Sequence, residues 1–503
     1  MKRDRLPSIG MRTALVIFAC VATSWSQTSS SHSDQAATTS EKNLETQLDQ
    51  LTIQLDGMRQ QLQDSQREMD ELRNELRSLR TQLAEKNQSD QAAEDEGALR
   101  ASVDKLREDT DVLQEQVKQH DQTKVETASK YPVRIFGTIL FTSVLNSGNV
   151  DNIDLPTVAL PKNPDGSQGS LSATPRQTIL GIDASGPRVW SAKSSADLSV
   201  DFFGGIPYAN YTSAAGIVRL RTAHAKLDWR DRALAAAFDR PLISPWQPTS
   251  WLTVGEPALA WAGNLWTWTP QLQFTERGIL PSRKLTVAVG LMDPAAPGAS
   301  DADGLRVPNP SESSRQPGYE ARVGYDGSLL EHPVHLGAGG YYSRQSYTYD
   351  RHVDAWAGTA DWSIALARAV GLSGEFYRGR GIGGLGGGAF KDYVTFDNYE
   401  YLRGLDDVGG WGQLKIVISP SLEANFAFGQ DNAFADDLRN SDLVSQQSTY
   451  VNLARNQDVM GNFVFRPKSY LLLSAEFRRI HSWPIAGQGN LNQTVGLAAG
   501  YSF

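Results

Sequence analysis

The last ten residues of the chain alternate strictly between two kinds of side chain. Val495, Leu497, Ala499, Tyr501 and Phe503 are interleaved with the small or polar Thr494, Gly496, Ala498, Gly500 and Ser502. Successive side chains of a β-strand point to opposite faces, so one face of this segment is apolar and the other is small and polar. A strand of a soluble sandwich can alternate in this way, and so does the wall of a membrane barrel, which meets lipid on one face. The segment therefore predicts a strand with one fully apolar face.

The composition alone resembles that of a soluble protein, with 40% hydrophobic residues. In a membrane barrel only every second side chain meets lipid, so the sequence shows no helix-like hydropathy peak. After the first 26 residues no stretch approaches about 18 consecutive apolar residues, and we expect no transmembrane helix. The formal charge of -9 argues against a nucleic-acid partner, which would require a concentrated basic face.

The beginning of the chain has the pattern of a secretory signal. Four basic residues lie within the first twelve positions, and an apolar run over 14–22 follows them. We expect residues 1–26 to form a signal peptide and the chain to be exported. The only cysteine, Cys20, lies in this segment, so the mature chain would contain no disulfide.

A heptad repeat follows the signal. Apolar residues recur at alternating steps of four and three at Leu44, Leu48, Leu51, Leu55, Met58, Leu62, Met69, Leu72, Leu76, Leu79 and Leu83, with Ser65 as the one interruption. This spacing predicts a coiled coil over 44–120, with a phase break at 84–98 and a disordered tip over 27–43. An amphipathic helix on a globular core is the alternative, but nearly every other position is polar. The sequence rules leave the number of helices open.

From Tyr131 onward the helical period is replaced by period-two segments. We predict about sixteen strands, near 132–145, 175–185, 193–204, 216–229, 231–240, 268–278, 283–292, 317–327, 333–345, 353–366, 368–379, 409–419, 421–430, 447–466, 468–480 and 491–503. Long polar connections alternate with tight turns. The predicted fold class is an all-β transmembrane barrel of about sixteen antiparallel strands over 131–503, preceded by the α-helical coiled coil.

Charged residues alternate with the apolar ones in several of these strands. An arginine facing lipid would cost roughly 2–4 kcal/mol at mid-membrane, so these charges are expected in the lumen, which stays aqueous at this strand number. The pore-lining candidates are Arg219, Arg221, Asp239, Glu320, Arg322, Asp361, Glu476 and Arg478. The arginines together would attract anions. The acidic residues of the same parity could instead neutralise them in structural pairs, so the selectivity stays open.

The long connection between the fifth and sixth predicted strands, about 241–266, is rich in tryptophan. It carries the constriction-loop candidates Trp246, Trp251, Trp261 and Trp266. If this loop folds inward, the rings could form an aromatic surface for sugar rings or other apolar solute faces. Alternatively, they pack the loop against the wall or belong to the interfacial aromatic belt.

Nothing in the sequence assigns an acid, a base and a nucleophile to one site. There is no zinc-protease helix, no nucleophile elbow and no cluster of histidines, so we predict no enzymatic activity, no cofactor and no metal site. Gly379, Gly381 and Gly384 fit a nucleotide-binding spacing, but no helix follows. We interpret this glycine-rich run as a flexible surface loop.

With the signal, the heptads and the strand pattern taken together, the chain resembles trimeric Gram-negative outer-membrane porins. It is most similar to those with an N-terminal periplasmic coiled coil, of the dicarboxylate-channel and phosphate-selective type. The most family-like stretches are 219–223 and 241–245. The resemblance implies a homotrimer in outer-membrane lipid, passive diffusion of small hydrophilic solutes, and an eyelet to which Arg219 and Arg221 would contribute. The tryptophan-rich loop departs from the family, so a general or sugar-tolerant channel is an alternative.

A structural role competes with the channel. The barrel would then be an outer-membrane anchor, and the coiled coil would tether the membrane to the cell wall peptidoglycan or to a periplasmic partner. A channel requires solute-dependent conductance, whereas an anchor requires binding through 44–117.

Overall fold

The computed structural model describes residues 132–166, 168–205, 216–279, 284–294, 306–329, 332–445 and 450–503. The predicted signal peptide (1–26), disordered tip (27–43) and coiled coil (44–120) lie outside these ranges. The chain divides into two compact units, 1–127 and 128–503, and all described residues belong to the second. None of the helices in the described ranges is long and apolar enough to cross a membrane.

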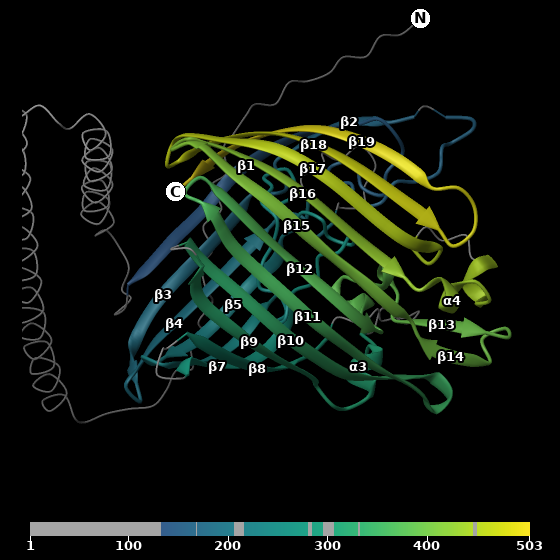
Figure 1. Ribbon diagram of the computed structural model, residues 1–503, viewed down its shortest axis with the longest axis horizontal. Coiled ribbons are helices and arrows are strands. Elements are labelled where there is room, and N and C mark those ends of the chain that lie inside the picture. Colours follow the sequence, from purple (N-terminus) through teal and green to yellow (C-terminus); the bar gives the residue numbers. More distant parts are fainter. Residues whose placement is uncertain are drawn as a thin grey trace, which may run out of the picture. The chain divides into compact units, whose positions relative to one another are not determined.

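The described unit is a single antiparallel sheet closed into a barrel, with short helices and one hairpin in its connections (Figure 1). The strands are β1 (Val133–Asn146), β2 (Ser170–Thr174), β3 (Ile179–Val189), β4 (Ala192–Asp201), β5 (Arg219–Asp228), β6 (Arg232–Asp239), β7 (Thr269–Ile279), β8 (Leu285–Met292), β9 (Gly318–Leu329), β10 (His332–Tyr347), β11 (Arg351–Ala367), β12 (Val370–Arg380), β15 (Asp406–Ser419), β16 (Leu422–Ala433), β17 (Leu453–Lys468), β18 (Leu471–Pro484) and β19 (Asn490–Ser502). A separate hairpin comprises β13 (Tyr393–Phe396) and β14 (Tyr401–Gly404). The short helices are η1 (Thr348–Asp350), η2 (Gly383–Leu385), η3 (Gly388–Phe390), η4 (Asp442–Ser445), α3 (Pro310–Ser313) and α4 (Ala435–Leu438).

Two of these segments share one position in the wall. β2 pairs with the end of β1 and β3 pairs with its beginning, so together they form one strand that is interrupted at 175–178. Pro175 lies at the interruption, where its ring has no N–H to give to the ladder. The barrel therefore has sixteen wall positions, and β19 closes it against β1.

The two ends of the barrel differ in the length of their connections. Tight turns such as 190–191, 368–369, 420–421 and 469–470 join strands at one end, which also holds the beginning of β1 and the end of β19. Long connections at 147–169, 240–268, 381–405 and 434–452 join them at the other end, where α4, β13 and β14 lie (Figure 1). We call these the short-turn end and the long-loop end.

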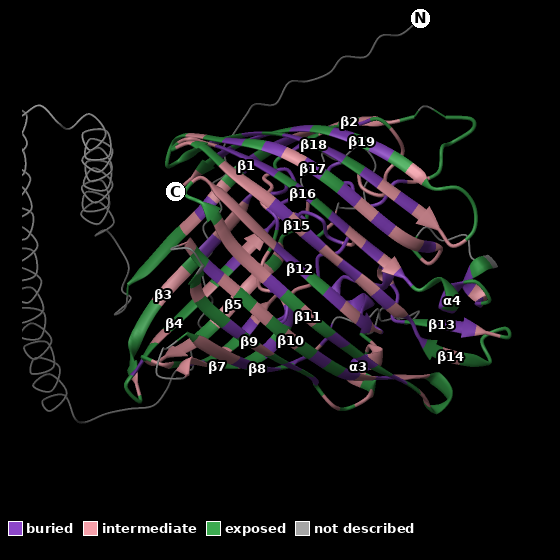
Figure 2. Ribbon diagram, viewed as in Figure 1, coloured by how far each residue is buried: buried purple, intermediate pink, exposed green. Residues whose placement is uncertain are grey.

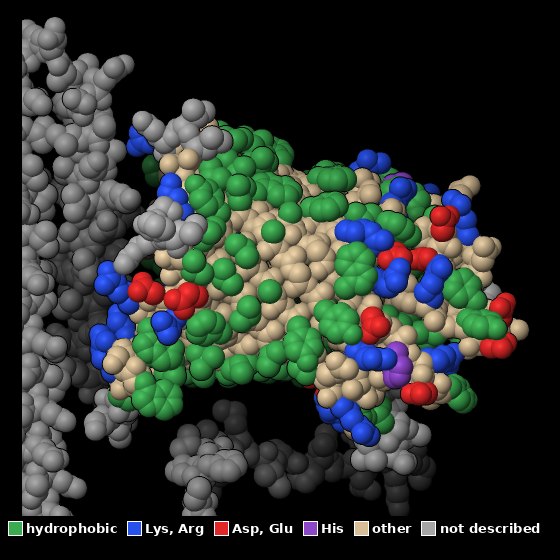
Figure 3. All heavy atoms as spheres, turned by 60° about the horizontal axis from the view of Figure 1, so that its bottom comes forward, with side chains coloured by type: hydrophobic (Ala, Val, Ile, Leu, Met, Phe, Trp, Pro, Cys, Tyr) green, Lys and Arg blue, Asp and Glu red, His purple; other side chains and the backbone are tan. Residues whose placement is uncertain are grey.

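Side chains alternate between the two faces of the wall. In β18, Leu473 is exposed together with its cross-strand neighbour Phe465. The next residue, Ser474, is buried together with its neighbour Val464. Buried and exposed residues alternate along the strands in the same way in Figure 2. On the face in Figure 3, hydrophobic side chains and backbone cover the middle of the wall, and charged side chains gather toward its two ends.

The strand prediction is confirmed for all sixteen wall positions, with shifts at the ends. The second predicted strand, 175–185, corresponds to β3, and β2 was not anticipated. The strand predicted from 447 begins at Leu453, since α4 and η4 occupy part of the preceding connection. The hairpin of β13 and β14 was also missed, because it lies inside a connection interpreted as a loop.

Two neighbouring alanines of β6 test which face of the wall meets lipid. Ala236 lies opposite Leu272 on the outward face, whereas Ala235 lies opposite Gln273 on the inward face. We expect Ala236→Arg to lower the free energy of unfolding in lipid vesicles by about 2–4 kcal/mol, because the charge would enter the hydrocarbon. Ala235→Arg adds the same side chain and is expected to cost clearly less. Equal losses in denaturant titrations of the two variants would contradict the assignment of the faces.

Candidate functional site

The connection between β6 and β7, residues 240–268, is folded into the barrel, and we call it the inner loop. Its apolar side chains Leu252, Leu259 and Leu265 are at most 1% exposed. They pack in separate clusters against inward-facing residues of the wall. A long loop lined with such residues has to bury them, and the interior of the barrel is where its contacts form. The inner loop therefore determines how much of the lumen stays open.

Acidic residues of the wall hold the inner loop by its backbone and hydroxyl groups. The N–H of Leu242 donates to Glu320 at 2.7 Å, and the N–H of Trp246 donates to Glu375 at 2.7 Å. The hydroxyl of Ser250 donates to Glu476 at 2.6 Å. The three carboxylates are at most 5% exposed. They serve as acceptors for the loop, as buried polar groups require, and do not line an open aqueous surface.

The interruption between β2 and β3 supplies another anchor. Gln177, fully buried, donates from Nε2 to the carbonyl of Leu252 at 2.8 Å. Its Oε1 accepts from the N–H groups of Val254 and Gly255 at 2.6 and 2.8 Å. One amide therefore satisfies three backbone groups of the loop. The sequence reasoning missed Gln177, and the only local signal was Pro175, which breaks the strand two residues earlier.

Arg219 and Arg221 both point into the lumen and share a single carboxylate. A bulge between β4 and β5 shifts the register at this point, so two arginines two residues apart reach Asp201. They also donate to the carbonyls of Gly255 and Val254 in the inner loop. The Asp201 side chain is 0% exposed, whereas those of Arg219 and Arg221 are 25% and 14% exposed. The accessible part of this cluster is therefore cationic.

Both guanidinium groups also lie near one aromatic ring. The Cζ atoms of Arg219 and Arg221 are 5.1 and 4.9 Å from the ring centroid of Trp268, at the end of the inner loop. Cation–π attraction at this distance helps to fix long side chains that otherwise have many rotamers. Trp268 therefore orients the pair, although the sequence analysis did not include it among the site residues.

Arg322 repeats this arrangement on β9, four wall positions from β5. It binds Asp361 through two hydrogen bonds, from Nε at 2.8 Å and from Nη2 at 2.6 Å. The Arg322 side chain is 17% exposed and that of Asp361 is 0% exposed. Asp361 also accepts a hydrogen bond from the indole of Trp246 at 3.0 Å. As with Arg219, the carboxylate is covered and the cation is reached by solvent.

The remaining pore-lining candidates differ in accessibility. Arg478 forms an ion pair with Asp458, and both side chains are 2% exposed. Asp239 is partly exposed and accepts from His224, whose other ring nitrogen contacts Asp197 at 2.7 Å. Arg478 thus belongs to the packed interior, while Asp239 lies in a mixed, partly solvated group.

The four tryptophans of the inner loop contact protein on several sides. Trp261 stacks on Phe390 at 3.9 Å between centroids and meets Trp266 edge-on at 5.7 Å. Trp251 packs on the cluster around Leu140, and Trp246 on the cluster around Leu259. Trp266 is buried and the other three are half-buried. Through these contacts the tryptophan rings pack the inner loop against the wall.

The segment 381–405, between β12 and β15, also enters the barrel, which corrects the interpretation of its glycine-rich part as a flexible surface loop. Ile382 and Leu385 are 0% and 1% exposed. Gly386 has a φ of 102°, and a Cβ there would lie 2.8 Å from the ring of Trp266. Glycine is needed here because no side chain fits between the segment and the inner loop. It also permits the left-handed backbone at Gly386.

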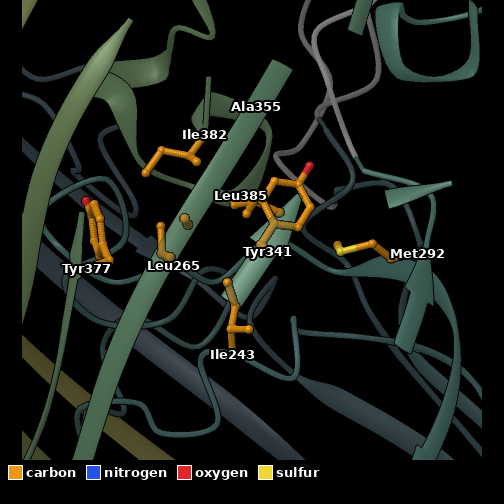
Figure 4. Close-up of a cluster of buried hydrophobic side chains, with 9 residues drawn as sticks. Ile243, Leu265, Met292, Tyr341, Ala355, Tyr377, Ile382 and Leu385 are labelled. Carbon is orange, nitrogen blue, oxygen red and sulfur yellow. The ribbon is translucent and has the colours of Figure 1, made fainter. Parts of the chain in front are cut away.

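Residues of both loops meet in one apolar cluster against the wall. Figure 4 shows Ile243 and Leu265 of the inner loop near Ile382 and Leu385. Wall residues complete it, among them Tyr341 of β10 and Tyr377 of β12 (Figure 4). The two loops therefore form a small hydrophobic core inside the barrel.

Comparisons with known proteins bear on the fold. The sequence matches no protein-family profile and no curated protein. Among solved structures the chain is similar to the outer membrane channel DcaP of Acinetobacter baumannii, with a TM-score of 0.57 and 16% identity over 75% of this chain and 99% of that chain. It also matches the anion-selective porin from Comamonas acidovorans, with a TM-score of 0.46 and 12% identity over 74% and 100%. A third match is OprB of Pseudomonas putida, with a TM-score of 0.46 and 11% identity over 74% and 94%. The likeness to DcaP shows a shared barrel fold.

Removing the amide of Gln177 tests whether this anchor fixes the inner loop. In Gln177→Leu the N–H groups of Val254 and Gly255 lose their acceptor, which costs about 1–3 kcal/mol for each buried group. We expect a more mobile loop, seen as larger current fluctuations and a higher mean conductance in planar bilayers. Gln493→Leu, at an exposed outward position, is the matched control. Unchanged current noise in Gln177→Leu would contradict the anchoring role.

Glu256 of the inner loop makes the site sensitive to pH. Burial raises the pKa of Glu256 from 4.5 to about 7, and its Oε2 has no hydrogen-bond partner within the described ranges. The folded loop thus favours the neutral acid, so this contribution to stability is complete below pH 4.5 and is lost as the pH rises through about 7. The ionised form also places a negative charge near Arg219. We expect the free energy of unfolding to fall between pH 6 and pH 8, and to change much less in Glu256→Gln. The same pH profile in both proteins would show that another group is responsible.

Proposed function

We propose that the protein is an outer-membrane porin through which small hydrophilic solutes diffuse passively, with a preference for anions. The observation that carries this proposal is the unequal exposure of opposite charges beside the inner loop. Arg219, Arg221 and Arg322 reach solvent, while their partners Asp201 and Asp361 are 0% exposed. A passing solute would therefore meet guanidinium groups.

The chemistry of these groups fits carboxylates and phosphates. A guanidinium presents paired N–H donors whose geometry matches the two oxygens of such an anion. Glu320, Glu375 and Glu476 cannot balance the arginines for a solute, because they accept hydrogen bonds from the inner loop. Rings of basic side chains favour anions in narrow pores. Diffusion in this proposal needs no catalytic group and no cofactor.

The architecture supports a place in the outer membrane. The closed sheet leaves no unpaired edge, its outward face carries exposed large apolar residues, and long connections alternate with tight turns. Short turns face the periplasm in bacterial barrels, so the long-loop end would face outward. The solved structure with the same fold is described as an outer membrane channel.

The oligomer and the N-terminal segments complete the proposal. We infer a homotrimer, with residues 1–26 as signal peptide, 27–43 as a disordered tip, 44–120 as a periplasmic coiled coil and 131–503 as the barrel. The heptad repeat supports association, because a single helix could not bury its apolar stripe. β1 begins at the short-turn end, which faces the periplasm in this proposal, and this supports a periplasmic location for the coiled coil. Contact of the coiled coil with peptidoglycan would follow from that position.

A structural anchor is the second candidate function. It is favoured by the apolar clusters that the inner loop and the segment 381–405 build inside the barrel. Such packing is typical of a lumen filled by protein. In this reading, the barrel would hold the membrane while the coiled coil binds the wall or a periplasmic partner.

Single-channel recording with a salt gradient tests the proposal. We expect an anion-selective reversal potential for the full-length protein, and a shift toward cations in Arg219→Gln/Arg221→Gln, because Asp201 then loses both partners. The matched control is Arg134→Gln/Arg188→Gln, which removes two charges near the short-turn end and should leave the potential nearly unchanged. Three equal conductance steps would support the trimer.

The opposite results have distinct meanings. A folded, heat-modifiable protein without conductance would exclude the open channel and favour the anchor. Conductance with an unchanged reversal potential in Arg219→Gln/Arg221→Gln would keep the channel and exclude these arginines as its selectivity determinants.

A further inference from the structure

A basic cluster lies on the outward face of β17 and β18, near the long-loop end. Arg479 lies opposite Val459, and His481 lies opposite Gln457, on the same face as the exposed Phe477. Arg455 lies opposite Trp483 on this face. We call Arg455, Arg479 and His481 the basic patch. It takes no part in the lumen described above.

Among the described residues, no carboxylate forms an ion pair with the basic patch. The neighbouring outward positions of β16 and β19 carry Gln430, Asn432, Leu491 and Gln493. Within the described part of the chain neither Arg455 nor Arg479 forms an ion pair, although the outward Arg378 and Arg380 of β12 both bind Asp406. Arg455 and His481 also lie close together, because both contact the ring of Trp483. Like charges are therefore gathered here at a cost that a bound anion would relieve.

The patch is held in a defined arrangement. The Cζ of Arg455 lies 3.6 Å from the ring centroid of Trp483, and the ring of His481 stacks on Trp483 at 3.6 Å. A Cβ at Gly489 would come within 2.6 Å of Nε2 of His481, so the tight connection before β19 is shaped to the patch. The Nε of Arg455 is buried and has no hydrogen-bond partner within the described ranges. The basic groups are thus positioned before any partner arrives, which reduces the entropy lost on binding.

An apolar surface continues from the patch toward the short-turn end. Phe477 and its partner Val495 come first, and Phe463, Leu473 and Leu497 follow on the same face. All five are exposed, at 45% to 61% of their accessible surface. A molecule that covers both regions needs an anionic head and a hydrocarbon tail, because charge complementarity applies at one end and burial of apolar surface at the other.

We propose that the basic patch binds the phosphate group of an acylated glycolipid in the outer leaflet, with the acyl chains lying along β17, β18 and β19. This inference rests on the proposed outer-membrane location, which would put the patch at the depth of the lipid head groups. It concerns the outer wall only, and it does not require that the lumen conducts.

The test uses the full-length protein in detergent, stripped of lipid. Bisphosphorylated lipid A and the same lipid after enzymatic removal of its phosphates are titrated, and bound lipid is counted by native mass spectrometry. The variant is Arg455→Gln/Arg479→Gln. The matched control is Arg315→Gln/Arg344→Gln, which removes one charge from the connection before β9 and one from β10, both at least five wall positions from β17. Heat-modifiable migration of every variant verifies the fold, and conductance is recorded on the same samples.

We expect the phosphorylated lipid to bind the parent and the control equally, and Arg455→Gln/Arg479→Gln to bind it roughly tenfold more weakly. The dephosphorylated lipid should bind the parent, the control and the variant equally weakly. Equal affinity of the variant, or equal binding of both lipids, would overturn the proposal. Competition by inorganic phosphate without any effect of the acyl chains would assign the patch to a soluble anion. A change of oligomeric state in the variant alone would assign it to a second copy of the chain. A parent protein that binds the phosphorylated lipid but does not conduct would contradict the porin proposal and still support the lipid site.

Discussion

Closure of the sheet is the constraint on which the rest of this structure depends. Gly137 and Phe503 exchange backbone hydrogen bonds at 3.1 Å in both directions, and the register continues from Thr138 opposite Ser502 along β1 and β19. A closed ladder gives each wall strand a hydrogen-bonded neighbour on both sides. At the interruption between β2 and β3, the hydroxyl of Thr178 accepts from the N–H of Leu140 at 3.0 Å. It also fixes the face of each residue, since a slip by one position would exchange the two faces. The chemistry of lumen and outer surface follows from this parity.

Inside the barrel, the wall acids and the inner loop depend on each other. The loop brings two backbone N–H groups and the hydroxyl of Ser250 into the barrel, and Glu320, Glu375 and Glu476 accept their hydrogen bonds. The acids would be costly to bury alone, and the loop supplies their donors. These hydrogen bonds also affect which charges are exposed in the lumen. Carboxylates bound to the loop no longer face a solute, while Arg219, Arg221 and Arg322 are the more exposed members of their ion pairs.

The wall could be predicted from the sequence because the alternation of apolar and polar residues is visible within each strand. The pattern of β18 and β19 needs only local alternation, and the sixteen positions were found in this way. Gln177, Trp268 and the buried glycine-rich segment were not, since their roles depend on contacts between residues about 50 to 120 positions apart. The sequence left two roles open for the tryptophans of the inner loop for the same reason. A ring in an inward loop can face a solute or another ring, and only the position of Phe390 decides the case of Trp261.

Two consecutive arginines show that the face of the wall on which a residue lies can determine its role. Arg478 points inward, is 2% exposed and is matched by Asp458 on the facing strand. Arg479 points outward, is exposed and forms no ion pair with another described residue. The side chains are chemically identical and adjacent in sequence. The first is part of the packed interior, where removing either partner would leave a buried charge. The second contributes to the basic patch, where the described residues supply no ion-pair partner and where we propose that a lipid phosphate binds. The closed sheet thus turns one repeated residue type into a structural element on one side and a recognition element on the other.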